Sequence, residues 1–587
     1  MSSFPPAGVF ILGALVLPFV PRRFRPVAFL APPLASLALL WALEPGNSLS
    51  VSFLDFQLVL ARVDRLSLAF GYVFALIALL GGVYALHLKD TGQQVAALLY
   101  GGSALGVAFA GDLFTLFVFW EVMAVASVYL VWARRTPASR RAGFRYLMVH
   151  LVGGSLLLAG AVVHYVETGS LLFEPMSGGA GAFLILVAFA INAAVPPLHA
   201  WLPDAYPQGT VTGSVFLSAF TTKAAVYALA RSFAGWEVLV WAGAAMAVYG
   251  VVYAVLENDI RGILAYHIVS QVGFMVAAVG LGTELAINAA TAHAFTHILY
   301  KGLLFMGAGT VLYATGRSKL TELGGIWRAL PLALGLYMVG ALSISGFPLF
   351  SGFVSKSMVV YAAEKEHMGL VVLLLNLASV GTFLHTGLKL PYFTWFGPAR
   401  SVPVGRVPWT MYAAMGLAAA INIGIGVWPA VLYGILPFPV TYKPYTVAHV
   451  SEILQLMLFT GFGFWLLVRM LKGEPTITLD TDWSYRRPAR LAYAVAVVYP
   501  SRLFAAAERV TLQVVRALAR VSQDPVGALG HAASRLLEWR ATRSGPQSPL
   551  PDASGYNPDR YRLPVEVMGL AVLALFVALM VWLLLRL

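Results

Sequence analysis

The chain has 587 residues, of which 59% are hydrophobic and 11% are charged, and its formal net charge is +13. Its mean hydropathy is +0.79, and apolar stretches of about 18 residues or more recur along most of its length, which is typical of a polytopic membrane protein. The absence of cysteine excludes disulfides, iron–sulfur clusters and thiolate zinc sites. The basic residues are spread over short loops and the C-terminal part, which argues against a nucleic-acid partner.

The apolar stretches predict an all-α membrane protein with about sixteen spanning helices. Helices are expected because backbone polar groups inside lipid must be satisfied within the chain, and the alternating strands of a membrane barrel are not visible. The first stretch follows no basic region, so we expect an uncleaved span rather than a signal peptide. The predicted spans are residues 4–20, 26–43, 66–87, 93–110, 112–133, 143–166, 180–203, 210–233, 238–257, 262–281, 286–313, 331–365, 369–396, 408–436, 448–471 and 564–586.

Lysine and arginine are distributed unevenly between the predicted loops. The loops after even-numbered spans carry only Arg62, Arg65, Arg231, Lys365 and Lys443. The loops after odd-numbered spans carry Arg22, Arg23, Arg25, Lys89, Arg134, Arg135, Arg140, Arg141, Arg261, Arg317, Lys319, Arg328, Arg400 and Arg406. Because cytoplasmic loops are enriched in these residues, we expect a multi-pass protein of the plasma (inner) membrane with both termini outside.

Two predicted spans are interrupted at corresponding places. Span 7 is interrupted by Pro196 and Pro197, and span 12 by Gly346 and Pro348 within the sequence SGFPLFSG. The span that follows each of them carries a lysine, so spans 4–8 and 9–13 are predicted to form two five-helix repeats, inverted because five is odd. The alternative is that proline and glycine are common in membrane helices anyway. The predicted segments are 1–92 (three helices), 93–233 and 238–396 (the repeats), 408–471 (two helices), 472–563 and 564–587 (a final anchor).

The segment 472–563 differs in composition from the rest, because it is rich in arginine and proline. Within residues 500–543 the pattern is amphipathic, and a continuous helix there would be about 65 Å long, although Pro525 is expected to kink it. One face would carry Arg502, Arg509, Arg516 and Arg520. This stretch is either a lateral helix on the cytoplasmic membrane surface or a helical cytoplasmic cap.

Glu121 and Lys223 lie deep in their predicted spans. Glu121 is in GDLFTLFVFWEVMAVASVYLVW and Lys223 is in VFLSAFTTKAAVYALAR. A charge at the bilayer centre costs several kcal/mol or more, so it is seldom placed there without a function. Both residue types can exchange protons when buried, which predicts a proton relay. The alternatives are a structural ion pair for Glu121 and snorkelling to the interface for Lys223.

A polar stripe is predicted in span 11, where His293, His297 and Lys301 are spaced by four residues and therefore share one helix face. Histidine titrates near neutrality and suits a proton shuttle. Two histidines four apart also suggest zinc, but neither an HExxH glutamate nor a third ligand is apparent, so we expect no metal. The remaining alternative is a pair of structural histidines in a helix interface.

Two further lysines lie in or after an interrupted helix. Lys356 follows the break in span 12, and unwound backbone beside a buried charge is the usual construction of an ion site in a transporter. Lys389, in TGLKLPYF, lies nearer a helix end, so snorkelling competes with a functional role.

These segments resemble the antiporter-like membrane subunits shared by Mrp-type cation/proton antiporters, respiratory complex I and membrane-bound hydrogenases, with the D-type Mrp subunit closest. The resemblance covers about residues 60–435. It is carried by GDLFTLFVFWE, VPPLHAWLPDAY, TTKAAVYALAR, ENDIRGILAYHIVSQVGF, HAFTHILYKGLLF, KLTELGG and SISGFPLFSGFVSK. It implies a fourteen-helix antiporter-like core with two inverted five-helix repeats and broken helices 7 and 12. The resemblance also implies a proton pathway through Glu121, Lys223, His297, Lys301 and Lys356.

One departure from the family pattern concerns the partner of Glu121. The resemblance implies a lysine in span 7, five residues before the proline of the PLH sequence, but Asn192 occupies this position. The asparagine side chain can form hydrogen bonds, but it is not ionisable and therefore cannot carry a positive charge. Lys223 or a neighbouring subunit could then supply the missing cation.

We therefore expect an ion-translocating membrane subunit of a multi-subunit Mrp-like complex, not an enzyme, that moves protons, in exchange for Na+ or another monovalent cation. Its expected partners are other membrane subunits and the lipid bilayer. No flavin, quinone, haem or iron–sulfur motif is visible, so no cofactor is expected. The alternatives are a proton-pumping subunit of a complex-I-like or hydrogenase-type redox enzyme, or a coupling subunit without its own pathway that energises another transporter.

Overall fold

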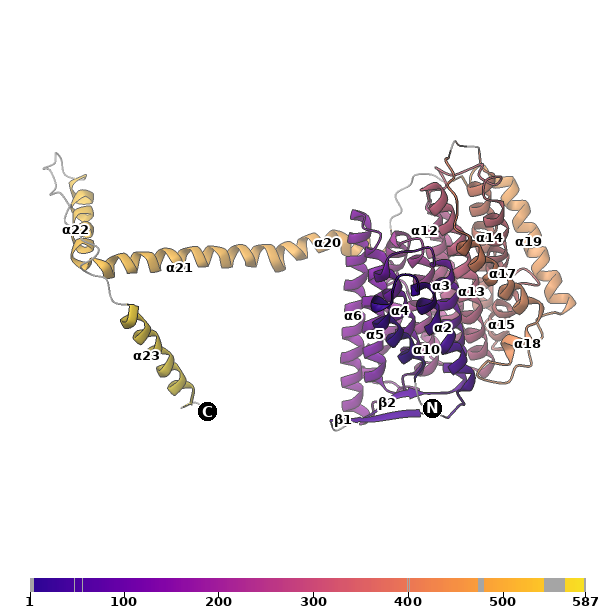
Figure 1. Ribbon diagram of the computed structural model, residues 1–587, viewed down its shortest axis with the longest axis horizontal. Helices are drawn as coiled ribbons and strands as arrows, with labels where there is room; N and C mark the ends of the chain where they lie inside the picture. The colour runs from indigo at the N-terminus through magenta and orange to yellow at the C-terminus, as the bar shows by residue number, and fades with distance from the viewer. Residues whose placement is uncertain are drawn as a thin grey trace. The chain divides into compact units, whose positions relative to one another are not determined.

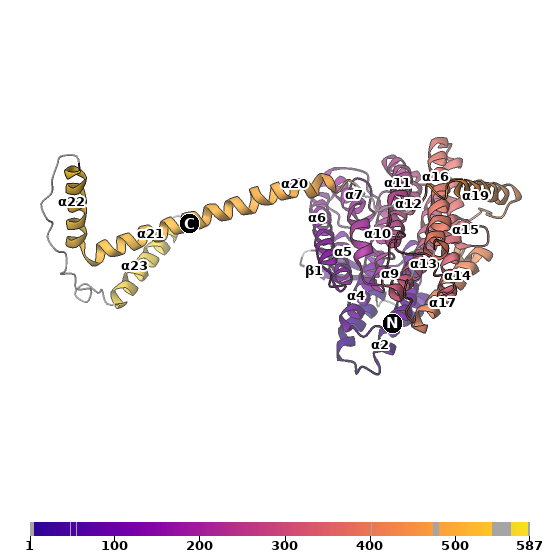
Figure 2. The ribbon, with the colours of Figure 1, turned by 90° about the horizontal axis from the view of Figure 1, so that it is seen from above.

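The computed structural model describes residues 5–46, 48–54, 56–398, 400, 402–472, 480–542 and 565–584. It divides into two compact units, Met1–Asp482 and Trp483–Leu587, and each unit is described by itself. The first unit is a bundle of helices, and Figures 1 and 2 show it from two directions.

The elements of the first unit follow one another as helices, short 3-10 or π-helical turns (η) and one pair of strands. They are α1 (Pro6–Val16), η1 (Leu17–Phe19), α2 (Arg25–Ala42), β1 (Ser48–Phe53), β2 (Phe56–Arg62), α3 (Arg65–Tyr84), α4 (Thr91–Phe109), α5 (Leu113–Trp132), α6 (Pro137–Thr168), α7 (Ala180–Asn192), α8 (Trp201–Ala205), η2 (Tyr206–Gln208), α9 (Gly213–Leu217), α10 (Thr221–Ser232), α11 (Glu237–Leu256), α12 (Ile260–Leu281), α13 (Glu284–Thr315), α14 (Pro331–Ser345), α15 (Ser351–Lys365), α16 (Gly369–Thr382), η3 (Phe383–Lys389), η4 (Tyr392–Phe396), α17 (Trp409–Val427), α18 (Ala430–Tyr433) and α19 (Val447–Leu467).

The predicted fold class is confirmed, and each of the sixteen predicted spans contains a helix in the described part of the chain. Eleven of these helices are long and apolar enough to cross a membrane. Four shorter apolar helices lie at other predicted positions, at Pro6–Phe19, Ala180–Asn192, Pro331–Ser345 and Gly569–Met580. The one remaining predicted span, residues 93–110, corresponds to α4. The predicted segment limits stay predictions.

The most deeply buried helices are α10, α12 and α13. They lie between the flank formed by α5 and α6 and the opposite flank formed by α17 and α19, as both views show. Every residue in the 18-residue apolar stretch of Gly213–Ser232 is buried, and the same holds for Ile260–Leu281. In the corresponding stretch of Glu284–Thr315, 89% of the residues are buried. Such a helix needs no polar face, so any ionisable residue on it lies inside protein rather than in lipid or water.

The long helices begin at side chains that cap their free N–H groups. Asp112 accepts a hydrogen bond from the Thr115 N–H (2.7 Å) at the start of α5, and Thr283 caps α13 in the same way. The second carboxylate oxygen of Asp112 accepts the Val59 N–H of β2 at 2.8 Å. These caps fix where α5 and α13 begin, and thereby the depth of the ionisable residues on them.

Both predicted helix breaks are confirmed. Helix α7 ends at Asn192 and α8 begins at Trp201, with Pro196 and Pro197 between them. Proline lacks an N–H and its ring clashes with the preceding turn, so the helix does not continue. Helix α14 ends at Ser345, where Gly346 adopts a left-handed φ of 77°, and α15 begins after Pro348 and Phe350.

Two further irregularities were not predicted from the sequence, which indicated continuous helices in spans 8 and 13. In span 8 the chain changes from α9 to α10 across Ser218–Phe220, immediately before Lys223. In span 13 the α-helix continues as the π-helical turn η3, which contains Lys389. Local departures of this kind often occur at functional sites. Neither segment itself contains proline, although Pro391 follows η3 by two residues within span 13.

A short antiparallel pair of strands, β1 and β2, joins α2 to α3 and was also not predicted. Polar and apolar residues alternate in SLSVSF, which is the pattern of a half-exposed strand. The segment is too short to change the fold class.

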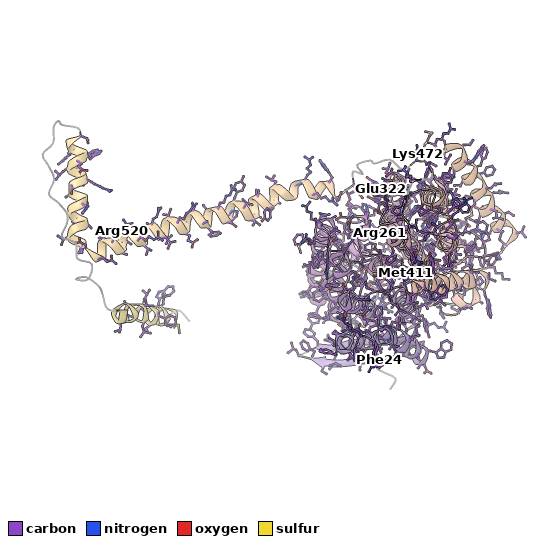
Figure 3. The ribbon with its side chains drawn as sticks, turned by 45° about the horizontal axis from the view of Figure 1, so that its top comes forward. Phe24, Arg261, Glu322, Met411, Lys472 and Arg520 are labelled. Carbon is purple, nitrogen blue, oxygen red and sulfur yellow. The ribbon has the colours of Figure 1, made fainter. Side chains whose placement is uncertain are left out.

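Arg261 corrects one sequence interpretation. It was counted among the basic residues of a cytoplasmic loop, but its side chain is completely buried at the start of α12 (Figure 3). Its guanidinium group donates hydrogen bonds to the Gly209 carbonyl and the Ser214 hydroxyl, each at 3.0 Å, and to the Pro207 carbonyl. Arg261 therefore holds the loop between α8 and α10 in place.

The second unit consists of helices in the predicted basic segment and at the C-terminal end. They are α20 (Trp483–Tyr493), η5 (Ala494–Val498), α21 (Tyr499–Gln523), α22 (Pro525–Ala541) and α23 (Val565–Leu584). Within the predicted amphipathic stretch, α21 ends at Gln523 and α22 begins at Pro525, where the sequence predicts a kink, and helical structure already begins at Trp483. The side chains of α21 project all round it in Figure 3, with Arg520 near its end. The choice between a lateral helix and a cytoplasmic cap stays open.

Candidate functional site

The polar stripe on α13 forms the centre of the candidate site. His293, His297 and Lys301 are completely buried, and they lie on one uninterrupted helix as the spacing predicted. In the described part of the chain, neither ring nitrogen of His297 nor the Lys301 Nζ has a hydrogen-bond partner. Buried polar atoms are almost always paired, so these orphans mark a place where protons or water can bind.

Lys223 lies beside this stripe on α10. Its side chain is completely buried, so it does not snorkel to a surface. The Nζ donates a hydrogen bond to the Ser218 carbonyl, which the break between α9 and α10 leaves free. His297 interacts electrostatically with both Lys223 and Lys301. The structure therefore brings these three predicted residues together.

The stripe continues to α15 through a hydroxyl group. The His293 Nδ1 lies 3.1 Å from the Ser355 hydroxyl, which also contacts the Thr296 hydroxyl at 2.7 Å. The next residue is Lys356, whose Nζ lies 3.4 Å from the Ile344 carbonyl at the end of α14. The broken helix thus supplies a free carbonyl to a buried lysine, as predicted for an ion site.

A cavity of about 890 Å³ reaches Lys356 from one end of the bundle. Its wall includes Ser345, Gly346 and Ser357 near the helix break. Toward the chain segments 283–285 and 439–457 it is lined by charged and titratable side chains, which are Glu284, Glu364, Lys443, His449 and Glu452. Acidic side chains along such a cavity raise the local concentration of cations, including protons.

Lys389 lies on a side branch of the site. It is 2% exposed, and its Nζ donates a hydrogen bond of 2.7 Å to the Val255 carbonyl at the end of α11. On the same turn, the His385 ring lies 5.8 Å from the ring of His267 on α12. Lys389 is thus held by a carbonyl near a helix end, and its contribution to a pathway stays a prediction.

Glu121 does not lie in the central cluster. It is half-buried on α5, and its Oε1 has no hydrogen-bond partner among the described residues. A Cβ atom on Gly154 of α6 would lie 1.6 Å from this oxygen, so the carboxylate fills the space above that glycine. Glu121 lines an otherwise largely apolar groove of about 510 Å³ between α4 and α5.

Asn192 approaches the same turn of α6 from another helix. It is 1% exposed at the end of α7, and neither atom of its amide group has a partner in the described structure. A Cβ on Gly153 would lie 3.6 Å from its Oδ1. Adjacent glycines therefore face Glu121 and Asn192, which are the two positions where the family pattern has a glutamate and a lysine. Among the ion pairs of the described residues, none includes Glu121.

A chain of hydroxyl groups from α4, α5 and α6, which was not predicted from the sequence, ends at Thr221 on α10. The Tyr146 hydroxyl lies 2.7 Å from that of Ser127 and 3.5 Å from that of Thr221, and Thr221 lies 2.6 Å from the Tyr100 hydroxyl. Thr221 precedes Lys223 by two residues. Such groups can pass a proton by exchanging donor and acceptor roles. They were missed, as were His267 and His385, because single polar residues in apolar helices form no recognisable spacing.

Comparison with known proteins supports the interpretation of the chain as an antiporter-like membrane subunit. Residues 110–383 match the family described as NADH:quinone oxidoreductase/Mrp antiporter, transmembrane. An uncharacterized protein of Methanocaldococcus jannaschii is 30% identical over 370 residues, which cover 59% of this chain and 76% of that protein. The D-type subunit of the Na(+)/H(+) antiporter of Alkalihalophilus pseudofirmus is 33% identical over 279 residues, which cover 44% of this chain and 56% of the relative.

A solved structure shares the fold. A chain of the Mrp complex from Dietzia sp. superposes with a TM-score of 0.65 at 24% identity, covering 76% of this chain and 98% of the other. With the broken helices and the matched sequence, these similarities place the chain in the NADH:quinone oxidoreductase/Mrp antiporter transmembrane family.

Proposed function

We propose that this chain is the proton-translocating subunit of a multi-subunit, Mrp-like membrane complex. The observation that carries the proposal is the set of four buried titratable side chains that cross the centre of the bundle, which are Lys223, His297, Lys301 and Lys356. An ammonium group in such a place costs several kcal/mol, and a fold that needed only stability would place apolar residues there.

The electrostatic arrangement supports translocation rather than static binding. The ion pairs of the described residues include none of these lysines. Lys223 repels both Lys301 and a protonated His297. When one group takes up a proton, its neighbours therefore hold theirs less tightly. A proton arriving at Lys223 promotes release from the next group along α13, and then from Lys356 into the cavity.

The predicted topology determines which side of the membrane each end of the pathway faces. With both termini outside the plasma (inner) membrane, the cavity beside Lys356 opens to the outside, and the break after α7 faces the cytoplasm. The acidic residues of the cavity also suit Na+ or another monovalent cation, which makes cation/proton exchange the specific form of the proposal.

Other membrane subunits are part of the proposal because Glu121 lacks a cation of its own. Its groove lies between α4 and α5, and Asn192 does not provide the charge that the family pattern has there. A neighbouring subunit that places a lysine or arginine against this groove would complete the ion pair. Any redox chemistry would likewise belong to partner subunits.

A second candidate is a coupling subunit that energises another transporter or a redox enzyme without a complete pathway of its own. The observation that favours it is Asn192, which is buried and unpaired where the family pattern has a lysine. This candidate predicts an assembled complex in which substitution of the central lysines leaves ion movement unchanged.

The experiment is to purify the complex from its native membranes in mild detergent, identify the co-purifying chains and reconstitute the complex into liposomes. Proton flux is measured with a pH-sensitive dye under gradients of Na+, K+ or choline. We expect membrane subunits to co-purify and a Na+ or K+ gradient, but not a choline gradient, to drive proton movement. An intact complex that moves no protons under any of these gradients would contradict the proposal.

A further inference from the structure

A carboxylate from the segment after α19 is inserted beside the break in span 7. Asp480 is 9% exposed and accepts hydrogen bonds from the hydroxyl groups of Tyr249 on α11 (2.5 Å) and Tyr266 on α12 (2.7 Å). Its other neighbour is His199, whose Nε2 lies 3.2 Å from the carboxylate. Asp480 therefore joins both halves of the bundle at the loop between α7 and α8.

His199 has one ring nitrogen that the carboxylate does not occupy. The side chain is completely buried, and its Nδ1 has no hydrogen-bond partner among the described residues. A neutral imidazole that donates its Nε2 proton to a carboxylate carries a free lone pair on Nδ1. The geometry thus presents a proton acceptor whose protonated form is stabilised by a fixed negative charge.

We propose that His199 and Asp480 form a proton-accepting pair at the break of span 7, through which protons from that side of the membrane reach the central lysines. The proposal rests on the proposed function and adds the place of uptake to it. A proton from the aqueous phase binds the His199 Nδ1, Asp480 stabilises the resulting imidazolium while remaining ionised, and the proton then leaves inward. The pair is unchanged after each transfer.

Contacts between the pair and the interior support a route. The indole of Trp201, two residues after His199, donates a hydrogen bond of 2.9 Å to the Ile191 carbonyl, which precedes Asn192. The ring of Trp201 lies 4.5 Å from that of His150, which is stacked at 4.0 Å on Tyr146. Tyr146 belongs to the hydroxyl chain that ends beside Lys223, so a series of contacts runs from Trp201, two residues after His199, to Thr221 on α10.

The charge of Asp480 is fixed by its surroundings. Burial alone would raise the pKa of this carboxyl, but the hydrogen bond with His199 and those from the two tyrosine hydroxyls hold that pKa well below its usual range. Other titratable groups of the surrounding helices include Tyr253, whose ring is stacked 4.4 Å from that of Tyr249, Glu257, which interacts electrostatically with Tyr266, and Asp204 on α8, which pairs with Arg145. Asp480 is therefore ionised at neutral pH.

The test uses the complete complex in liposomes, with proton flux measured as a function of the pH on the side of the α7 break. Asp480→Asn keeps the shape and removes the charge, and His199→Gln removes the proton acceptor. We expect each variant to assemble normally and its flux at neutral pH to fall by about 100-fold, the usual loss of a general base. We also expect the pH profile of the residual flux of Asp480→Asn to differ from that of the unaltered complex, because the variant removes a fixed negative charge beside the proposed pathway.

Two control variants distinguish a role of the pair in proton transfer from a purely structural role. Glu508→Gln removes an exposed carboxylate of α21 and should leave the flux unchanged. Thr481→Ala removes the 3.1 Å hydrogen bond from its hydroxyl to the Pro197 carbonyl but keeps the pair, and should retain most of the flux. A loss in Thr481→Ala as large as that in Asp480→Asn would show a structural clasp and overturn the proposal.

The outcomes also distinguish this proposal from the proposed function. Wild-type flux and an unchanged pH profile in Asp480→Asn would overturn the pair while leaving translocation intact. If Asp480→Asn prevents assembly, His199→Gln decides in the same way. An absence of flux in the wild-type complex itself would instead contradict the proposed function.

Discussion

Three buried lysines, Lys223, Lys301 and Lys356, have no carboxylate partner among the described residues. Lys223 and Lys356 each face a carbonyl freed by a helix break, whereas the Lys301 Nζ has no partner. A paired lysine would hold its charge permanently, whereas an unpaired one can change protonation state. The missing counter-ions are therefore part of the proposed mechanism.

The packing of Glu121 on α6 gives a test with an internal control. Gly154→Ala would place a methyl group within 1.6 Å of the Glu121 Oε1, whereas the nearest atom to a Cβ on Gly153 lies at 3.5 Å. Alanine favours helix over glycine by about 1 kcal/mol, so loss of helix stability would not explain a defect. We expect proton flux to fall in Gly154→Ala and to persist in Gly153→Ala, with both variants assembled. Equal flux in the two variants would show that the position of Glu121 does not matter.

The family lysine can be restored at Asn192. Asn192→Lys would place an ammonium group near Glu121 across the two glycines of α6, and a nearby cation favours an ionised carboxylate. We expect the pH profile of proton flux to move to lower pH, as measured in liposomes over a range of symmetric pH values. A profile identical to that of the unaltered protein would mean that another group already supplies the charge.

The buried lysines and Glu121 could be identified from the sequence, because the free-energy cost of a charge in lipid makes ionisable residues rare in long apolar stretches. It did not locate His199 and Asp480, since a histidine in a proline-rich loop and an aspartate in a basic segment are ordinary. Their proximity depends on chain segments that are far apart in sequence. For the same reason, the hydroxyl chain from Ser127 to Thr221 became visible only in the structure.

At the scale of elements, the described helices are interrupted beside the lysines of both repeats. The prolines and glycines of spans 7 and 12 identified two breaks from sequence alone. The change from α9 to α10 and the π-helical turn η3 were not predictable, because tertiary packing rather than local propensity determines them. The hairpin of β1 and β2 was not predicted because its strands, of 6 and 7 residues, are short beside the apolar stretches that flank them.

The break between α14 and α15 depends on one close contact. A Cβ on Gly352 would lie 1.7 Å from the Ser343 carbonyl oxygen, so only glycine allows α15 to approach the end of α14. We expect Gly352→Ala to destabilise the protein by about 1–3 kcal/mol, the usual cost of overpacking, as a lower thermal transition in detergent. Gly335→Ala on α14, where nothing lies within 4 Å, is the control. The same transition temperature in both variants would contradict the tight packing at the break.

At the scale of the whole first unit, the proposed pathway has two ends. The cavity beside Lys356 lies at one end, and the His199–Asp480 pair lies at the break of span 7. The central lysines and histidines lie between them in tightly packed protein. In the proposed mechanism, protons pass between these side chains without a continuous aqueous channel.

The cavity can be probed directly because the chain contains no cysteine. Val360 lines the cavity, whereas Ala224, the neighbour of Lys223, is completely buried. We expect a membrane-impermeant maleimide to modify Val360→Cys from the outside and not to modify Ala224→Cys from either side. Modification of Val360→Cys only from the cytoplasm would reverse the predicted topology.

The central claim is that protons cross the bundle through titratable groups held inside it, and the proton flux of Lys223→Ala in reconstituted complexes tests it most directly. Lys319→Ala, which removes an exposed lysine, is the matched control. We expect Lys223→Ala to assemble with its partner subunits and to lose cation-driven proton flux, while Lys319→Ala behaves as the unaltered protein. Full flux in an assembled Lys223→Ala complex would contradict the account.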